Sequence, residues 1–178
     1  MKKILLALIG VIALVLLVAA LMPKDFKIEK EIVINKPQSQ VFNYLKMVKN
    51  GNEWNPWMKK DFNKGPNDVQ SFKGEDGAVG FVNSWSSDDK ELGVGEEQIT
   101  AIVPNEKIEL ELRLIKPAKA THHISFTTVS VGENQTKVTW TMTGRNDFPF
   151  NIVCFFMQKE ASKNFVTGLT DLKAALEK

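Results

Sequence analysis

The chain has 178 residues and a nearly balanced charge, with 23 lysines and arginines against 21 aspartates and glutamates. Lys2 and Lys3 stand before an apolar run, and without them the basic and acidic side chains are equal at 21 each. A nucleic-acid-binding domain usually carries a basic excess or stripe, so this composition argues against that class. The single cysteine excludes an internal disulfide, and the fold must therefore depend on its hydrophobic core.

The N-terminal run, residues 4–22, contains no charged or polar side chain. A helix of that length rises about 1.5 Å per residue and nearly covers a hydrocarbon core of roughly 30 Å. Positive charge precedes the run at Lys2 and Lys3, whereas Lys24 after it is followed at once by Asp25. We therefore expect residues 1–22 to be a single-pass transmembrane anchor, with the N-terminus in the cytoplasm and the soluble domain on the periplasmic or extracytoplasmic side.

A cleaved signal sequence is the alternative, because Val18-Ala19-Ala20 resembles a small-residue cleavage site. The apolar region of a signal peptide is usually about 7–15 residues long, and this one is longer, which favours an uncleaved anchor. Only residues 23–25 separate the run from the next predicted strand, and fully extended they span on the order of 10–14 Å. A domain on so short a linker has to lie against the membrane surface.

The first elements after the anchor are a strand and two short helices. Apolar residues alternate with charged ones over residues 26–35, which predicts the strand. Asn35 and Pro37 form a helix-start signal, and apolar residues at helical spacing continue to Val48. A turn at residues 50–52 leads into residues 54–58, where Pro56 keeps any helix short.

Six strand-like runs and one long helix make up the remainder. The runs, each bounded by turn signals, cover residues 69–73, 80–86, 95–103, 108–115, 118–131 and 136–143. Short gaps between them predict an antiparallel meander. Residues from about 148 to 178 have apolar side chains every three to four positions, which predicts an amphipathic helix that closes the apolar face of the sheet.

Several short strings occur in a fixed order along the same elements. They are Ile34-Asn35-Lys36-Pro37 with residues 41–45, Trp54-Asn55-Pro56-Trp57, Gly93-Val94-Gly95 with Ile99, and residues 104–108, 136–144 and 168–173. With these strings the chain resembles the START-like helix-grip superfamily, in particular its polyketide cyclase/dehydrase-type branch, SRPBCC. The resemblance covers essentially everything after the anchor, residues 23–178.

The resemblance implies an α+β helix-grip fold, in which a curved antiparallel sheet of about seven strands wraps around the long C-terminal helix, with two short helices after the first strand. It also implies a cavity between the sheet and that helix. Members bind lipids, sterols, polyketides or other apolar molecules, and some are cyclases, hydrolases or co-chaperone domains. Because function varies with the cavity lining, the fold does not decide it.

The residues predicted to line the cavity are large apolar side chains and one histidine. They are Trp54, Trp57, Phe81, Trp85, Leu110, Leu112, His122, Ile124, Phe126, Trp140, Met142 and Phe156. By resemblance, Trp54 and Trp57 lie at one end of the cavity, either as a lid or as a plug of ordinary core. For Trp85, Trp140 and Met142, core packing is the competing interpretation and the favoured one.

Few residues offer chemistry. His122 and His123 are adjacent in a strand, so they point to opposite faces and cannot bind one metal together. His122 is in phase with Ile124 and is expected to point inward, as a general base, a ligand contact or, the favoured interpretation, a hydrogen-bonded core residue. Carboxylates such as Glu97 are interpreted as solvated strand ends. No nucleophile, base and orienting group can be assembled, so we expect no catalytic residue, metal site or cofactor.

The sequence thus favours a noncatalytic module that binds a hydrophobic small molecule or a lipid, tethered to the membrane by residues 4–22. One alternative is a cyclase- or hydrolase-like enzyme that uses the same cavity, with His122 as its acid or base. Another is a protein-interaction domain of the co-chaperone kind, which would have a filled interior. No nucleic-acid partner is expected, and nothing in the sequence identifies a protein partner.

Overall fold

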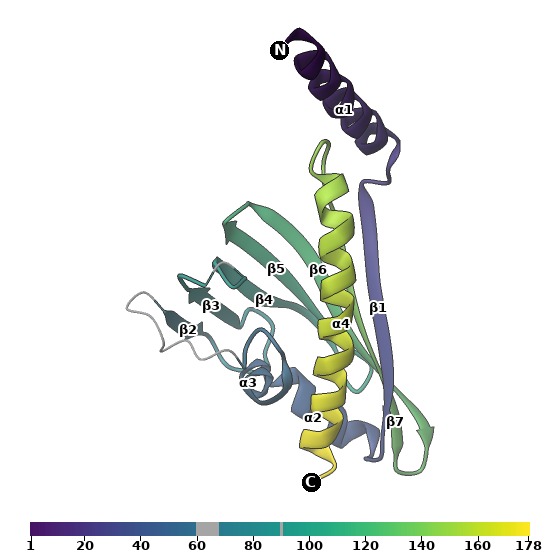
Figure 1. The fold of residues 1–178 in the computed structure, drawn as a ribbon. Helices are drawn as coiled ribbons and strands as arrows, with labels where there is room; N and C mark the ends of the chain where they lie inside the picture. Colours follow the sequence, from purple (N-terminus) through teal and green to yellow (C-terminus); the bar gives the residue numbers. More distant parts are fainter. Residues whose placement is uncertain (60–67, 90) are drawn as a thin grey trace.

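The chain begins with one helix, continues through seven strands with short helices after the first, and ends in a long helix (Figure 1). The computed structural model describes residues 1–59, 68–89 and 91–178, apart from the side chains of Val153, Cys154 and Phe156. The elements are α1 (Lys2–Leu21), β1 (Asp25–Ile34), α2 (Gln38–Lys46), a 3-10 turn η1 (Val48–Asn50), α3 (Gly51–Trp54), β2 (Val69–Lys73), β3 (Val82–Ser86), β4 (Val94–Val103), β5 (Lys107–Lys116), β6 (Ala120–Gly132), β7 (Gln135–Arg145) and α4 (Asn151–Leu176). This order confirms the predicted α+β helix-grip fold.

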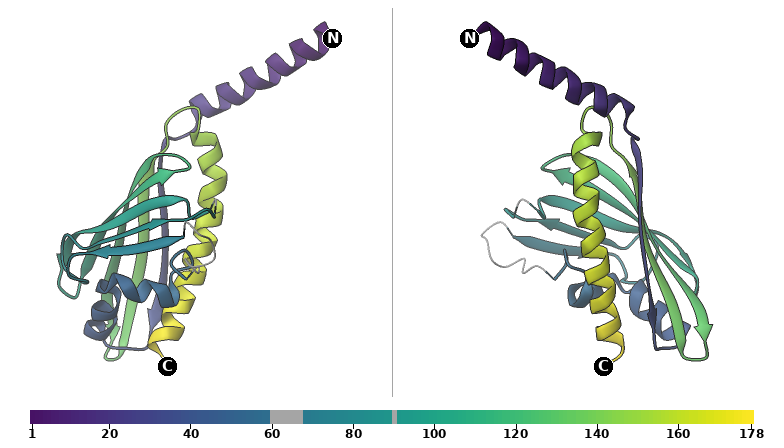
Figure 2. Two further views of the ribbon diagram at one scale, coloured as in Figure 1. Left: turned by 90° about the vertical axis from the view of Figure 1, so that its left-hand side faces the viewer. Right: turned by 45° about the vertical axis from the view of Figure 1, so that its right-hand side comes forward.

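The seven strands form one antiparallel sheet in the order β1-β7-β6-β5-β4-β3-β2. Strands β2 to β7 follow one another as the predicted meander, and β1 joins the sheet beside β7, where Ile28 is opposite Met142. The sheet is curved, and α4 runs along its inner face beside β1, while α2 and α3 lie near the C-terminal half of α4 (Figures 1 and 2). The sheet and α4 therefore enclose the interior of the domain.

The core between the sheet and α4 is centred on an aromatic stack. The rings of Trp140 on β7 and Phe165 on α4 are nearly parallel, with centroids 4.0 Å apart, and both residues are almost fully buried. Trp54 and Trp57 meet Trp140 edge to face, at 5.3 and 6.2 Å. Contacts of this kind contribute about 0.5–1.5 kcal/mol each beyond the area they bury, so Trp140 fixes α4 and the segment after α3 to the sheet.

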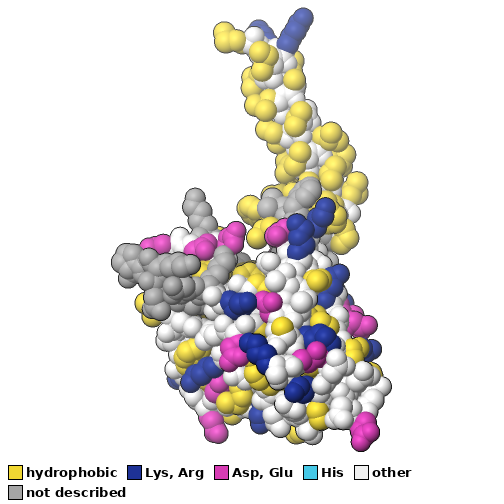
Figure 3. Space-filling model, turned by 60° about the horizontal axis from the view of Figure 1, so that its bottom comes forward, with side chains coloured by type: hydrophobic (Ala, Val, Ile, Leu, Met, Phe, Trp, Pro, Cys, Tyr) yellow, Lys and Arg dark blue, Asp and Glu magenta, His cyan; other side chains and the backbone are white. Residues whose placement is uncertain are grey.

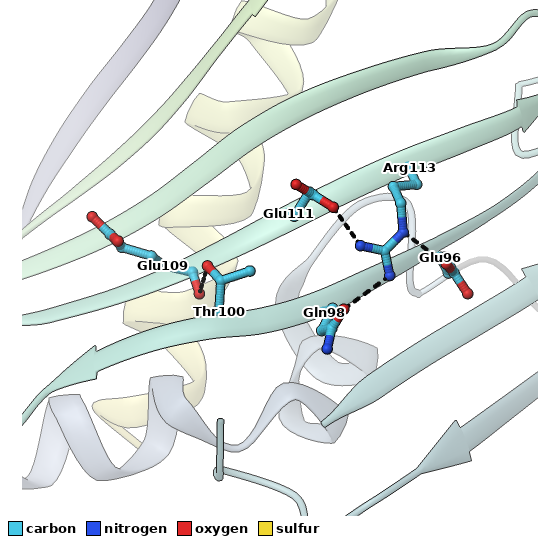
Figure 4. Close-up of polar contacts among 6 residues, drawn as sticks. All are labelled: Glu96, Gln98, Thr100, Glu109, Glu111 and Arg113. Carbon is cyan, nitrogen blue, oxygen red and sulfur yellow. Dashed lines mark hydrogen bonds and ion pairs between the residues drawn. The ribbon is translucent and has the colours of Figure 1, made fainter. Parts of the chain in front are cut away.

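The outer face of the sheet carries a cluster of charged and polar side chains on β4 and β5. Arg113 on β5 donates from Nε to Glu96 Oε1 at 2.7 Å and from Nη2 to Gln98 Oε1 at 3.0 Å, and it also pairs with Glu111 (Figure 4). Glu96 lies opposite Arg113 in the ladder, so neighbouring strands present these groups to the same side. Alternation then turns Leu110 and Leu112 of β5 toward the interior, as the sequence predicted.

Helix α1 leaves the domain at the end where α4 begins (Figure 2). Its surface is almost wholly hydrophobic, with the basic side chains at its N-terminal tip (Figure 3). In the part of the chain that the structure describes, it is the one helix long and apolar enough to cross a membrane, a criterion that a signal sequence near the N-terminus would also meet. Ala19, near its C-terminal end, is fully buried against the domain.

Helix α4 begins three residues later than predicted, at Asn151 instead of Phe148. Pro149 explains the difference, because a proline disfavours helical backbone at the residue before it. Further along, Gly168 faces the aromatic stack: a Cβ built there would lie 2.8 Å from Trp140 Cζ3 and 2.9 Å from Pro56 Cδ. A glycine in a helix costs about 1 kcal/mol relative to alanine, and here it permits the close approach of α4 to the sheet.

We expect Gly168→Ala to lower the free energy of unfolding by about 1–2 kcal/mol, because overpacking costs about 1–3 kcal/mol and outweighs the gain in helix propensity. Denaturant unfolding followed by tryptophan fluorescence measures the change. Val166→Ala is the control, since Val166 is exposed on the same helix and its truncation should alter stability by less than about 1 kcal/mol. A stabilised Gly168→Ala variant would show that the close approach is not limiting.

Candidate functional site

A cavity of about 270 Å³ lies between the inner face of the sheet and the first half of α4. Seven of the twelve residues predicted to line a cavity are in its wall: Trp57, Trp85, Leu112, His122, Ile124, Trp140 and Met142. The sequence analysis missed several apolar members of the same wall: Phe26, Ile28, Met58, Leu92, Leu114, Met157, Ala161 and Phe165. The wall is therefore mainly aromatic and aliphatic, with a few polar side chains.

Five of the twelve predicted residues lie elsewhere. Trp54, Leu110 and Phe126 line a second cavity of about 30 Å³, a volume close to one water molecule's share of the liquid. Phe81 is a buried core residue whose ring stacks on Phe72 with centroids 6.0 Å apart. The side chain of Phe156 lies outside the described residues. Leu110 and Phe126 do face the interior, but side chains that line both cavities, Trp140 and Ile124 among them, lie between the two spaces.

One row of register partners crosses the sheet through the main cavity. Asn83 on β3, Glu97 on β4, Leu112 on β5, His122 on β6 and Gly144 on β7 are consecutive partners. Paired residues share a face of the sheet, so the row brings a carboxyl and an imidazole to the same cavity. Alternate strands are about 10 Å apart, and Leu112 stands between the two polar groups, so they do not exchange a proton directly.

Glu97 is not a solvated strand end, as the sequence analysis supposed. It lines both cavities, and its Oε1 accepts a hydrogen bond of 2.9 Å from Asn83 Nδ2. Asn83 is buried, and its Oδ1 accepts a bond of 3.1 Å from Gln70 Nε2. Burial raises the pKa of the Glu97 carboxyl, while the bond from Asn83 lowers it by a smaller amount. The sequence held a signal, since Glu97 is in phase with Ile99, which is fully buried.

His122 points inward, and His123, its neighbour in the chain, is exposed. The imidazole Nδ1 is buried without a hydrogen-bond partner in the described part of the chain. The sequence favoured a core histidine held by hydrogen bonds, and Nδ1 does not fit that prediction. The ring meets Phe26 edge to face at 5.3 Å. Both rings occupy the space over Gly144, where a Cβ would lie 2.4 Å from Nδ1. Burial lowers the pKa of His122, and His123 lowers it further.

The polar groups suit contact with a ligand more than metal chemistry. No group of three or more histidine, cysteine or acidic side chains suited to a metal occurs among the residues that the structure describes. A carboxyl with a raised pKa and an imidazole with a lowered pKa are both biased toward their uncharged forms. Each can then donate or accept one hydrogen bond with a bound molecule inside an apolar wall.

Comparison with known proteins gives relatives by structure only. No protein-family model matches the chain, and no curated protein matches it. Norcoclaurine synthase from Thalictrum flavum is similar with a TM-score of 0.61 at 11% identity, over 86% of this chain and 87% of that one. Aha1 from Colwellia psychrerythraea is similar with a TM-score of 0.57 at 21% identity, over 85% of this chain and 96% of that one.

A protein from Mesorhizobium loti is similar with a TM-score of 0.60 at 17% identity, over 85% of this chain and 97% of that one. Identities this low establish the fold and leave the chemistry open. The chain therefore has the helix-grip fold of the SRPBCC and Bet v 1-like proteins.

Proposed function

We propose that the chain is a membrane-tethered, noncatalytic module that holds a small hydrophobic molecule between the sheet and α4. The observation that carries the proposal is the cavity of about 270 Å³ with its aromatic and aliphatic wall. Binding sites for small molecules usually have about 300–1,000 Å³ and a mainly apolar lining with a few polar groups. A volume just below that range favours a small or single-chain molecule over a whole phospholipid.

Two of the similar proteins bear on the alternatives. Norcoclaurine synthase was solved in complex with dopamine and hydroxybenzaldehyde, and Aha1 was solved as a dimer. The first supports a fold that accommodates small molecules. The interaction alternative expected a filled interior, and the cavity does not favour it.

An enzyme that uses the cavity remains the second candidate, because Glu97 adds an acid to the base offered by His122. Both residues line the cavity, on strands separated by β5. A substrate would have to lie between the two groups, because they are too far apart to form a pair. Conversion of a bound molecule by the wild type, and its loss in Glu97→Gln without loss of binding, would favour this candidate.

The tether is supported by the contact between α1 and the domain. Asn151, at the start of α4, donates from Nδ2 to Ala19 O at 2.7 Å and to Met22 O at 3.2 Å, and it is buried. Cleavage after Ala20 would remove the first acceptor and leave a buried amide short of a partner, at about 1–3 kcal/mol. Exposed apolar side chains at the same end, Phe150 and Leu21, suit a membrane surface.

We expect native mass spectrometry of the full chain, extracted from its own membranes without added lipid, to find a reproducible small-molecule mass on the folded protein. Ala161 lines the cavity, so Ala161→Phe should reduce the occupied fraction about tenfold by filling the space. Ala174→Phe places the same ring on an exposed position of α4 and should leave the occupied fraction unchanged. A wild-type protein that is always bare would contradict the proposal.

The stability of the domain should depend on pH through Glu97. Folding raises the pKa of this carboxyl above its usual 4.5, so the folded state holds the proton more tightly than the unfolded state. Its contribution to stability is complete below about pH 4.5 and is lost as the pH rises through the raised value. Glu97→Gln keeps an uncharged group there, so its stability relative to the wild type should increase with pH. Urea unfolding between pH 4.5 and 8 measures the difference, and a constant difference would mean that Glu97 titrates as it does in water.

The full chain should remain in membranes after alkaline carbonate washing, with an intact mass that includes residues 1–22. Protease added from the extracytoplasmic side should degrade the domain. Leu14→Arg places a charge near the centre of α1, at about 2.5–3.5 kcal/mol, and should release the protein, whereas Leu14→Ile should not. Recovery of a wild-type chain that begins after Ala20 would identify a signal sequence instead.

A further inference from the structure

We infer that a separate hollow on the surface, between β1 and α4, holds the acidic headgroup of an amphiphile whose single apolar chain occupies the cavity of about 270 Å³. This inference rests on the proposed function and names its ligand class. The hollow has a volume of about 440 Å³ and is lined by residues of β1 and of the first half of α4. It is called the lysine groove here, after Lys27, Lys30 and Lys159 in its wall.

The lysine groove is positively charged. Three lysines face one glutamate in its wall, and Lys27 pairs with Glu29 at 2.7 Å, which leaves Lys30 and Lys159 to supply the net charge. Lys30 is the ladder partner of Trp140, so its side chain starts from the inner face of β1 and is half-buried. An ammonium group binds a carboxylate or phosphate as a point charge, and the lysine stems add apolar surface.

The lysine groove and the cavity share a wall. Ile28 on β1 and Gln158 on α4 line both hollows. Ser162 adds a hydroxyl on the lysine side, and Met142 and Phe26 add apolar surface on the cavity side. Ile28 and Gln158 therefore lie between the two hollows, and a molecule with its charged end among the lysines and its chain among the aromatic rings has to extend past these two side chains.

The size of each hollow restricts the ligand. The cavity of about 270 Å³ has room for one hydrocarbon chain, and the lysine groove lies along the edge strand β1. A fatty acid or another single-chain acid fits both requirements. A neutral apolar molecule would use the cavity and gain nothing from the lysines.

The test uses the full chain in nanodiscs of a zwitterionic lipid, with decanoate and decanol as probes, each carrying bromine on the terminal carbon. Bromine quenches indole fluorescence on contact, and Trp57, Trp85 and Trp140 line the cavity. Partition into the bilayer is the same for every variant, so differences between variants report on the protein. We expect the wild type to be half-quenched by decanoate at about a tenfold lower concentration than by decanol.

Lys30→Gln and Lys159→Gln should each raise the half-quenching concentration of decanoate about fivefold and leave that of decanol unchanged, because a partly exposed ion pair contributes modestly. Lys163→Gln is the matched control: this lysine is one turn from Lys159, pairs with Glu160 at 2.8 Å and lies outside the groove wall. Equal quenching by decanoate in the wild type and both groove variants would overturn the inference.

The remaining outcomes separate the two proposals. Inorganic phosphate at the same concentration as brominated decanoate should not displace it from the protein. If phosphate does displace the decanoate, and to the same extent in Ala161→Phe, the lysines form an anion site independent of the cavity. That result would overturn the inference. Quenching by decanol alone, without dependence on the lysines, would keep the proposed function and reject the headgroup site. Absence of quenching by either probe in the wild type would reject both.

Discussion

The stack of Trp140 on Phe165 is the contact on which the rest of the interior depends. Trp140 is on β7, between the edge strand β1 and β6, and its ring stacks on that of Phe165 in α4 with centroids 4.0 Å apart. It also lines both cavities, as do Met58, Glu97 and Ile124, so it is part of the partition between them. On one side of it, Trp54 and Phe126 are packed into a nearly filled core, and on the other α4 stands away from the sheet and leaves space.

The second constraint is electrostatic. The outer face of the sheet satisfies its charges in pairs, as Arg113 does with Glu96 and Glu111, whereas the inner face holds Glu97 and His122, whose pKa values are shifted in opposite directions by burial. Both pKa shifts favour the uncharged form of the side chain, and an uncharged group costs less to bury in an apolar cavity than a charged one. The lysines of the lysine groove carry positive charge at the edge of the sheet, beside the cavity.

The strands were predictable because turn signals bound each of them, and because apolar and charged residues alternate clearly in β1 and β5. Leu110 and Leu112 on β5 were assigned to the inner face by phase alone, and the order of elements gave the fold. The alternation along a strand shows which face of the sheet a residue occupies, but not which other side chains it contacts. Leu110 was therefore predicted to line the same cavity as Leu112, although Leu110 lines the smaller cavity and Leu112 the larger, with Trp140 in the wall of both. Glu97 was assigned to solvent because it is charged, although its position two residues before Ile99 places it on the inner face of β4. The lysine groove depends on the packing of β1 against a helix more than 120 residues later in the chain, which no local pattern records.

The bonds from Asn151 to Ala19 and Met22 have a mechanical consequence. They join the last turn of α1 to the first turn of α4, with only residues 22–24 between α1 and β1. One buried side chain thus restricts the angle between the two helices, because a large rotation of α1 would break both bonds. Since the first half of α4 also supplies one wall of the cavity, the same helix that lines the cavity holds the end of α1.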